Sequence, residues 1–271
     1  DYNYYFQLER SWMPIFGNRV NVQSTLDEIT ISPSFFAPFV NVDADKKYRD
    51  PDYNIFNYPI ESLSEDKNNY VPFKVNNELI KKLLIDTLPT NVILGLPEAL
   101  GKGTLIQGPL VTPILKKMMF KSDNFLAEQL LINAQRVQGY ETQKTYLNYL
   151  KSSLFASLPD LMIWVDGSGL SVYNMNTPRN LVKALEIIFH MITWDEIIEL
   201  FPDKFSDENI NNSFVYAKTG TLRHNQALSG YLITQSGRKL AFSFISNHYT
   251  VPPSKIRAET EKILLHIRDA Y

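Results

Sequence analysis

The C-terminal end of the chain carries the pattern that most constrains the fold. Residues 227–234 and 239–246 are two apolar runs of strand length, and the four residues between them, 235–238, include a glycine and suit the connection of a β-hairpin. In residues 254–271 apolar side chains recur at helical spacing. These features predict an antiparallel strand pair on which a C-terminal helix packs.

Helices are predicted through the middle of the chain. Apolar side chains at helical spacing indicate helices over about residues 76–87, 124–138 and 142–155. Thr177-Pro178 predicts the start of a further helix, because a cap residue followed by a first-turn proline is the favoured order. Helices should therefore precede the C-terminal strands.

The first part of the chain is predicted to be β-rich. Val20, Val22, Ile29 and Ile31 alternate with polar neighbours, as in two half-buried strands joined by a turn. Residues 41–69 are charged, rich in asparagine and punctuated by proline, which predicts long surface loops. We place a domain boundary there and expect a β-rich domain over residues 1–70 and a mixed domain over residues 71–271.

Composition excludes several classes of function. A formal net charge of -2, without a block of lysine and arginine, gives no reason to expect a nucleic-acid partner. The absence of cysteine removes disulfides and thiol nucleophiles, and the 4 scattered histidines lack metal-ligand spacing, so we expect no metal.

No apolar run reaches the roughly twenty residues of a membrane span. Since the first residues also lack a signal-peptide pattern, we expect either a cytosolic protein or a chain that begins after a segment was removed.

Two short polar motifs are candidates for a functional site. Ser122-Asp123-Asn124 precedes a predicted helix, and helix capping alone would explain it. Lys218-Thr219-Gly220 with Thr221 leads into the C-terminal strands and, taken alone, could begin an exposed strand. S-D-N followed by K-T-G is, however, part of the signature of penicillin-binding proteins and serine β-lactamases. The joint match in the required order is much more specific than either motif.

Three stretches extend this likeness to one family. FKSDNFLAEQLL, VDGSGLSVYNMNTPRNLVKAL and AKTGTLRHNQALSGYLITQSGRKLAFSFISN together cover most of residues 110–250. They resemble the DacB-type penicillin-binding D-alanyl-D-alanine carboxypeptidases and endopeptidases. Val172 stands where the family pattern has an arginine, and we interpret Asp166 as a structural loop residue whose carboxylate accepts backbone N–H groups.

The resemblance implies a fold and a substrate. The fold is α/β of the α+β kind, with a β-lactamase/transpeptidase-like antiparallel sheet flanked by helices, and residues 1–70 are part of an inserted β-rich domain. The implied partners are peptidoglycan stem peptides and β-lactam antibiotics, without a cofactor. The implied location is periplasmic or otherwise extracytoplasmic.

The resemblance also implies roles for the motif residues in acyl transfer. The Ser122 hydroxyl joins the proton relay toward the leaving amine, and the Asn124 amide holds the nucleophile's lysine partner and a substrate carbonyl. Lys218 supplies a fixed positive charge. The substrate-binding residues implied by the family are Thr219 and Thr221, whose hydroxyls contact the terminal carboxylate, and Gly220, which lets an extended substrate approach. The N–H of Thr221 is the expected second oxyanion donor.

The family's nucleophile, the serine of a Ser-x-x-Lys at the start of a buried helix, has no suitable match. Ser64 to Lys67 lies in a charged loop pattern, and Ser236 to Lys239 falls in the hairpin turn. We expect that a preceding segment with the nucleophile completes the site. Two alternatives are a non-catalytic module that has lost the nucleophile and binds cell-wall peptides, and an interaction module with chance motifs.

Overall fold

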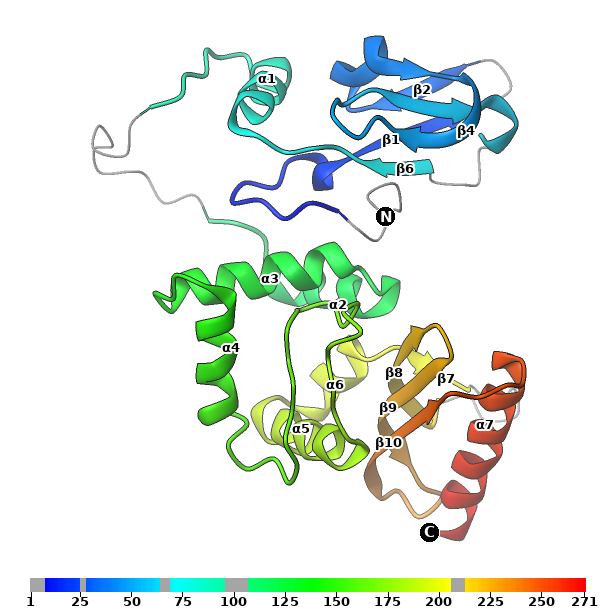
Figure 1. The fold of residues 1–271 in the computed structure, drawn as a ribbon. Helices are drawn as coiled ribbons and strands as arrows, with labels where there is room; N and C mark the ends of the chain where they lie inside the picture. Colours follow the sequence, from blue (N-terminus) through cyan, green and yellow to red (C-terminus); the bar gives the residue numbers. More distant parts are fainter. Residues whose placement is uncertain (1–7, 25–27, 64–68, 96–106, 206–212) are drawn as a thin grey trace. The chain divides into compact units, whose positions relative to one another are not determined.

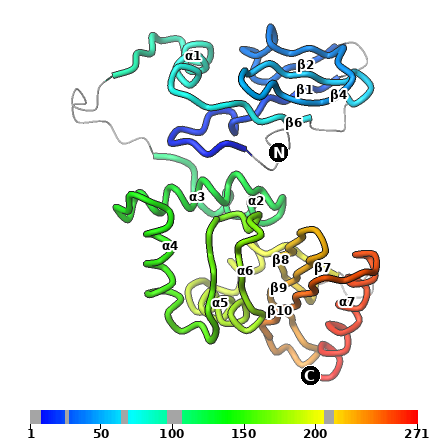
Figure 2. The backbone as a smooth tube through the Cα atoms, in the orientation of Figure 1, coloured from blue at the N-terminus to red at the C-terminus, as the bar shows by residue number. Residues whose placement is uncertain are grey.

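The computed structural model describes residues 8–24, 28–63, 69–95, 107–205 and 213–271. The chain divides into two compact units, Asp1–Gly108 (the first unit) and Pro109–Tyr271 (the second unit). Figure 1 shows the elements of each unit, and Figure 2 follows the same backbone as a tube. Each unit has its own core and is described by itself.

The described residues of the first unit form two small sheets, three short 3-10 helices and one α-helix. The first sheet has the order β2-β1-β6 and is antiparallel, while the second has the order β3-β5-β4, with β3 parallel to β5. The elements are η1 (Phe16–Asn18), β1 (Arg19–Ser24), β2 (Ile29–Ser32), η2 (Ser34–Phe39), β3 (Val40–Asn41), β4 (Asp43–Arg49), β5 (Phe56–Pro59), η3 (Ile60–Ser62), β6 (Asn69–Pro72) and α1 (Asn77–Thr87).

Two predictions for this unit have different outcomes. The strand pair predicted from alternating valines and isoleucines is confirmed, because Val22 of β1 pairs with Ile31 of β2. The prediction that residues 41–69 are surface loops is wrong, because β4 and β5 lie within this range. Phe56 and Tyr58 of β5 are fully buried, so contacts with distant residues outweigh the polar composition of this stretch.

The core of the first unit also includes helix α1. Asn76 caps this helix by accepting a hydrogen bond from the Leu79 N–H at 2.8 Å, and Leu79 and Leu83 pack into the cluster formed by the buried strand residues. The compact unit therefore extends to Gly108, beyond the boundary that the sequence predicted at residue 70.

The second unit has a four-stranded antiparallel sheet of order β10-β9-β8-β7 with helices around it. Its elements are α2 (Val111–Lys121), α3 (Asn124–Val137), α4 (Gln143–Ser152), α5 (Pro178–Met191), α6 (Trp194–Leu200), β7 (Asp203–Lys204), β8 (Val215–Leu222), β9 (Asn225–Ile233), β10 (Lys239–Asn247) and α7 (Pro253–Ala270). The predicted hairpin, the C-terminal helix, and the helices near residues 124, 142 and 178 are confirmed.

The sheet of the second unit has a different set of helices on each face (Figure 1). Val215 and Ala217 of β8 pack with Leu264 of α7 on one face. On the other face Tyr231 of β9 packs with Leu185 of α5 and Ile197 of α6. Since side chains alternate along a strand, the odd-numbered residues of β8 face α7 and the even-numbered residues face the other helices.

A glycine allows β8 and β9 to pair closely. A Cβ added to Gly230 would lie 2.2 Å from the carbonyl oxygen of Tyr216 and 2.5 Å from the Cα of Ala217. Both contacts are with backbone, which cannot move without breaking the ladder. Gly230 therefore fixes the position of the strand that carries the Lys-Thr-Gly motif.

Gly230→Ala is expected to lower the free energy of unfolding by about 1–3 kcal/mol or more, because the strands must separate to relieve the overlap. Urea unfolding followed by circular dichroism measures this change. The matched control is Gly220→Ala, whose Cβ would meet the Ala227 Cβ at an ordinary 3.6 Å. Equal unfolding midpoints for the two variants would contradict the proposed packing role.

Candidate active site

The Ser-Asp-Asn trio forms the junction between α2 and α3. Asp123 is the N-cap of α3, and its Oδ1 accepts a hydrogen bond from the Leu126 N–H at 3.0 Å. Ser122 ends α2 in the left-handed region at φ 49°. The capping interpretation therefore explains Asp123, while the side chains of Ser122 and Asn124 are available for other contacts.

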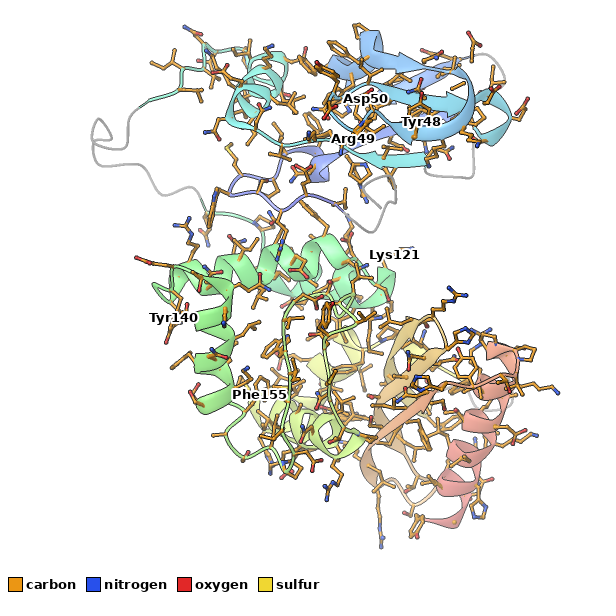
Figure 3. All side chains as sticks on the ribbon, in the orientation of Figure 1. Tyr48, Arg49, Asp50, Lys121, Tyr140 and Phe155 are labelled. Carbon is orange, nitrogen blue, oxygen red and sulfur yellow. The ribbon has the colours of Figure 1, made fainter. Side chains whose placement is uncertain are left out.

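The structure brings Ser122 and Lys218 together across 96 residues of sequence. Lys218 lies on the face of β8 opposite α7. Its ammonium donates to the Ser122 hydroxyl and, at 3.0 Å, to the carbonyl oxygen of Thr219. Figure 3 labels Lys121, the last residue of α2, next to this junction. Burial, and secondly the positive charge of Lys204, lower the pKa of Lys218 below its ordinary value.

The remaining motif residues lie around this contact in different ways. Asn124 is half-buried in the first turn of α3, and its side-chain amide makes no hydrogen bond to another residue that the structure describes. Thr219 lies on the opposite face of the sheet from Lys218, where it lines a hollow of about 170 Å³ together with Ile256 and Arg257 of α7. Its hydroxyl therefore does not share a face with the Ser122–Lys218 contact.

The motif strand also has an open edge. Within the described residues, β7 pairs only with Val215 and Tyr216 of β8, so Lys218 to Leu222 have a strand neighbour only on the β9 side. The Ala217 N–H points away from β9, because it donates to the carbonyl of Pro202 at 2.9 Å. By the alternation of an antiparallel ladder, the N–H groups of Thr219 and Thr221 point to the same open side. An extended peptide can pair with this edge.

Two carboxylates fix the DGSGLS loop (residues 166–171), that of Asp166 from within the loop and that of Glu128 from α3. Asp166 accepts hydrogen bonds from the N–H groups of Gly169 and Ser171, both at 2.7 Å, which fits its predicted structural role. Glu128 of α3 accepts from the N–H groups of Gly167 and Ser168 at 3.0 and 2.9 Å. Glu128 lies one helical turn after Asn124, so the loop is fixed near the trio's helix.

Sequence reasoning missed Glu128 and Lys204. The spacing of four residues between Asn124 and Glu128 is a signal that could have placed both on one face of α3. Lys204 comes from β7, a two-residue strand, and nothing in the local sequence links it to the Lys-Thr-Gly motif. Its electrostatic effect on Lys218 is therefore visible only in the folded chain.

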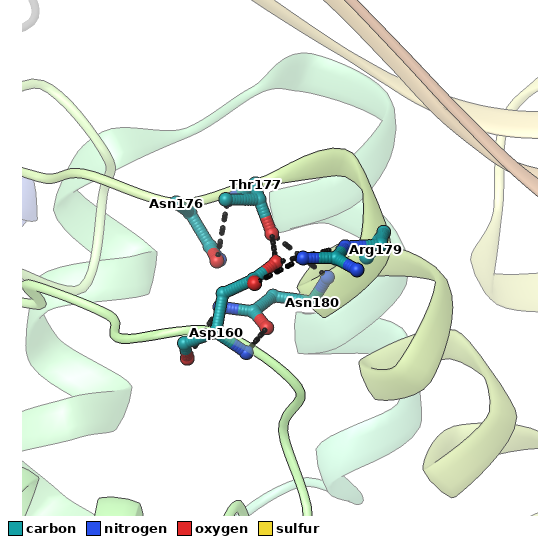
Figure 4. Close-up of polar contacts among 5 residues, drawn as sticks. All are labelled: Asp160, Asn176, Thr177, Arg179 and Asn180. Atoms are coloured by element: carbon teal, nitrogen blue, oxygen red, sulfur yellow. Dashed lines mark hydrogen bonds and ion pairs between the residues drawn. The ribbon is translucent and has the colours of Figure 1, made fainter.

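A polar cluster fixes the start of α5 (Figure 4). The Asp160 carboxylate accepts hydrogen bonds from the Thr177 hydroxyl at 2.6 Å and from the Arg179 guanidinium at 2.5 and 3.2 Å. The hydrogen bond from Thr177, followed by those from Arg179, lowers the pKa of Asp160 below its ordinary value. The buried Asn180 pairs with the backbone of Asp160 in both directions, at 2.9 and 3.1 Å. The cluster ties the segment before the DGSGLS loop to α5.

Of the two Ser-x-x-Lys strings, the one that the structure describes does not supply a partner for this site. Ser236 lies in the turn between β9 and β10, where its hydroxyl contacts Thr234 and the carbonyl of Tyr271. The string from Ser64 to Lys67 lies outside the described residues. Within the described ranges, no three His, Cys, Asp or Glu side chains form a group that could hold a metal ion, and no helix there is both long and apolar enough to span a membrane.

Comparison with known proteins extends beyond the motifs. A family model described as D-Ala-D-Ala carboxypeptidase 3 (S13) family matches residues 106–266. D-alanyl-D-alanine carboxypeptidase DacB of Haemophilus influenzae is 28% identical over 194 residues, which cover 65% of this chain and 40% of that protein. Carboxypeptidase DacB of Mycolicibacterium smegmatis is 27% identical over 223 residues, or 70% of this chain and 48% of that protein. The chain thus spans less than half the length of these two curated relatives.

A solved structure supports the predicted fold class. The crystal structure of penicillin binding protein 4 (dacB) from Haemophilus influenzae, complexed with a β-lactam, superposes with a TM-score of 0.58 at 23% sequence identity. The match covers 92% of this chain and 67% of that chain. The expected antiparallel sheet flanked by helices, of the β-lactamase/transpeptidase-like kind, is therefore confirmed.

Removal of the Glu128 carboxylate should loosen one end of the DGSGLS loop. In Glu128→Ala we expect faster amide hydrogen exchange at Gly167 and Ser168, with a local loss of about 1–3 kcal/mol, because two N–H groups lose their acceptor. The amides of Gly169 and Ser171 should stay protected by Asp166. Glu199→Ala, which removes an exposed carboxylate 3.7 Å from Lys116, is the control. Uniform exchange changes across the loop would contradict this division of contacts.

Proposed function

The chain belongs to the D-Ala-D-Ala carboxypeptidase 3 (S13) family, and from this premise we propose that it forms part of a serine-type peptidase acting on peptidoglycan stem peptides that end in D-Ala-D-Ala. The reaction is cleavage through an acyl-enzyme. The whole protein is extracytoplasmic in this proposal, since its substrate lies there. β-Lactam antibiotics acylate the same site.

The contact between Lys218 and Ser122 is the observation that carries the proposal. The family uses the Ser-Asp-Asn and Lys-Thr-Gly motifs in one site. Here the Lys218 ammonium of one motif donates a hydrogen bond to the Ser122 hydroxyl of the other, although 96 residues separate them. A chance match of two short motifs gives no reason for such a contact. The contact therefore favours a shared site over an interaction module with chance motifs.

The proposed mechanism uses this contact to move a proton. A serine of a Ser-x-x-Lys segment outside this chain attacks the peptide carbonyl, forming the acyl bond while the bond to the leaving D-alanine amine breaks. The attacking serine gives its proton to the lysine of its own segment, and the Ser122 hydroxyl accepts that proton while it donates its own to the leaving amine. The Lys218 ammonium next to Ser122 polarises the hydroxyl. The Asn124 amide, which has no other described partner, holds the substrate carbonyl and the lysine of the nucleophile segment.

The open edge of β8 provides the proposed substrate-binding surface. The stem peptide pairs with the edge in an extended conformation, and the absent side chain of Gly220 leaves room for its close approach. The Thr221 N–H, which points to the open side, donates to the developing oxyanion. Lys218 attracts the terminal carboxylate. Thr219 lies on the α7 face of the sheet, opposite Lys218. Its predicted contact with the terminal carboxylate therefore has weaker support than the contact proposed for Lys218.

A non-catalytic module for cell-wall peptides is the second candidate. The observation that favours it is the position of Ser236, which lies in a hairpin turn rather than at the start of a helix facing Lys218. This candidate predicts reversible peptide binding without acylation. Labelling of the protein expressed from its complete gene separates the two candidates.

Incubation of the full-length protein with a fluorescent penicillin is expected to give a covalent adduct. Lys218→Ala should lower the rate of labelling roughly 10- to 100-fold, the effect of losing one charge-assisted contact. Denaturing electrophoresis with in-gel fluorescence measures the rate. Lys262→Ala, which removes an exposed lysine paired with Glu259 on α7, should label at the unaltered rate. Reversible binding of a D-Ala-D-Ala peptide with no adduct would instead support the second candidate.

The binding of a carboxylate by Lys218 should depend on pH through the lowered pKa of this lysine. Because only the ammonium form attracts the carboxylate, the affinity for N-acetyl-D-Ala-D-Ala is complete below that pKa and is lost as the pH rises through it. Lys204→Met removes the like charge, so the loss should move to higher pH. Titration calorimetry over an alkaline pH series measures the midpoint. Lys239→Met should leave it unmoved, and a downward shift in Lys204→Met would refute the electrostatic link.

A further inference from the structure

The first unit contains an aromatic groove that the proposed peptidase site does not use. The groove has a volume of about 330 Å³, within the range of small-ligand sites. It lies between η2, the turn before β5, and helix α1. Its lining residues are Phe35, Phe36, Phe39, Tyr53, Asn54, Ile55, Asn76, Glu78, Leu79 and Lys82.

The aromatic wall of the groove combines a buried anchor with exposed rings. Phe36 is buried in the core, and its ring centroid lies 5.3 Å from that of Phe56 and 5.2 Å from that of Phe73. The rings of Phe35 and Phe39 are tilted relative to each other, with their centroids 6.1 Å apart, and Phe39 is 44% exposed. Phe35 is half-buried, so the exposed ring of Phe39 in particular leaves apolar surface in water, which a ligand would cover.

The tyrosine across the groove is exposed but held in a rigid turn. Tyr53 is 67% exposed. The Asp50 carboxylate, labelled in Figure 3, accepts hydrogen bonds from the N–H groups of Asp52 and Tyr53 at 2.8 and 2.9 Å. Asn54 pairs with the backbone of Lys74 through both its oxygen and its amide, at 2.7 and 3.0 Å. The backbone that carries the Tyr53 ring is therefore held in place before any ligand binds.

Polar groups around the groove can form hydrogen bonds with both the donors and the acceptors of a ligand. The carboxylate of Glu78, the ammonium of Lys82 and the hydroxyl of Tyr53 make no hydrogen bond or ion pair with other residues in the described part of the chain. The Asn76 oxygen caps α1, which leaves its amide N–H groups to donate. A wholly apolar partner would leave these groups dehydrated and unpaired.

We propose that this groove binds an N-acetylated sugar chain, such as the glycan strand that carries stem peptides in the cell wall. The C–H faces of a sugar ring carry partial positive charge and stack on the negative faces of aromatic rings. The hydroxyl and acetamido groups of the sugar match the mixed donors and acceptors around the groove. This inference rests on the proposed function for the choice of cell-wall glycan, and it assigns the first unit a role in holding the strand.

Binding of the N-acetylglucosamine tetramer to the 271-residue chain, measured by titration calorimetry, tests the inference. Tyr53→Ala and Phe39→Ala should each weaken binding about tenfold, since each removes one stacking surface. Tyr53→Phe keeps the ring and should lose at most about threefold. The matched control is Tyr48→Ala, because Tyr48 is a 41% exposed tyrosine of the same unit outside the groove. The unfolding midpoint of each variant is measured in parallel.

Several results would overturn the inference. These are no binding of the tetramer by the unaltered chain, affinity in Tyr53→Ala and Phe39→Ala that equals that of the unaltered chain, a loss in Tyr48→Ala as large as theirs, and binding of cellotetraose, which lacks acetamido groups, as tight as that of the tetramer. Occupation of the groove by a second copy, seen as dimers that Tyr53→Ala abolishes, would also overturn it. The sugar probe contains no peptide. Failure of the peptidase proposal would therefore appear as absent penicillin labelling with sugar binding intact.

Discussion

The close pairing of β8 with β9 is the contact on which the arrangement of the second unit depends. Gly230 lets the two backbones approach, and their register sends Ala217 toward α7 and Lys218 toward the other helices. The Tyr231 hydroxyl donates to the carbonyl of Leu185 at 2.7 Å, which ties β9 to α5 on that second face. Strand alternation, rather than a long-range attraction, thus brings Lys218 to the end of α2.

The sequence predicted those helices and strands whose signals lie within their own residues or directly beside them. The C-terminal hairpin, α7 and the start of α5 at Thr177 have complete signals within a few residues. The strand β5 could not be predicted in this way, since Phe56 and Tyr58 become buried only when distant segments meet. Helix α2 lacks a side-chain cap at Leu110, so it has no strong local signal. Helix α6 has only 7 residues, but a capping box of Thr193 and Glu196 marks its start, and this local signal was not used in the prediction.

The candidate site shows the same division between local and distant information. The motifs located Ser122, Asn124 and Lys218 by residue type and order, and the Asp166 carboxylate was predictable because its N–H partners follow it directly. The sequence could not show that Lys204 lowers the pKa of Lys218, because this effect depends on the distance between strands. Nor did it show that Thr219 faces α7, although strand alternation implies opposite faces for neighbours.

The backbone at Ser122 links stability to the proposed chemistry. A left-handed conformation costs a residue with a side chain on the order of 1 kcal/mol, and glycine is the usual residue where a helix ends in this way. Two helices joined through Ser122 and Asp123 require such a turn, and Asp123 already satisfies the start of α3. Glycine at position 122 would serve the turn with less strain, so folding alone does not account for a serine there. In the proposed mechanism the hydroxyl does account for it, because a serine side chain at this position contacts Lys218 and places a group able to transfer a proton between the helical junction and the strand.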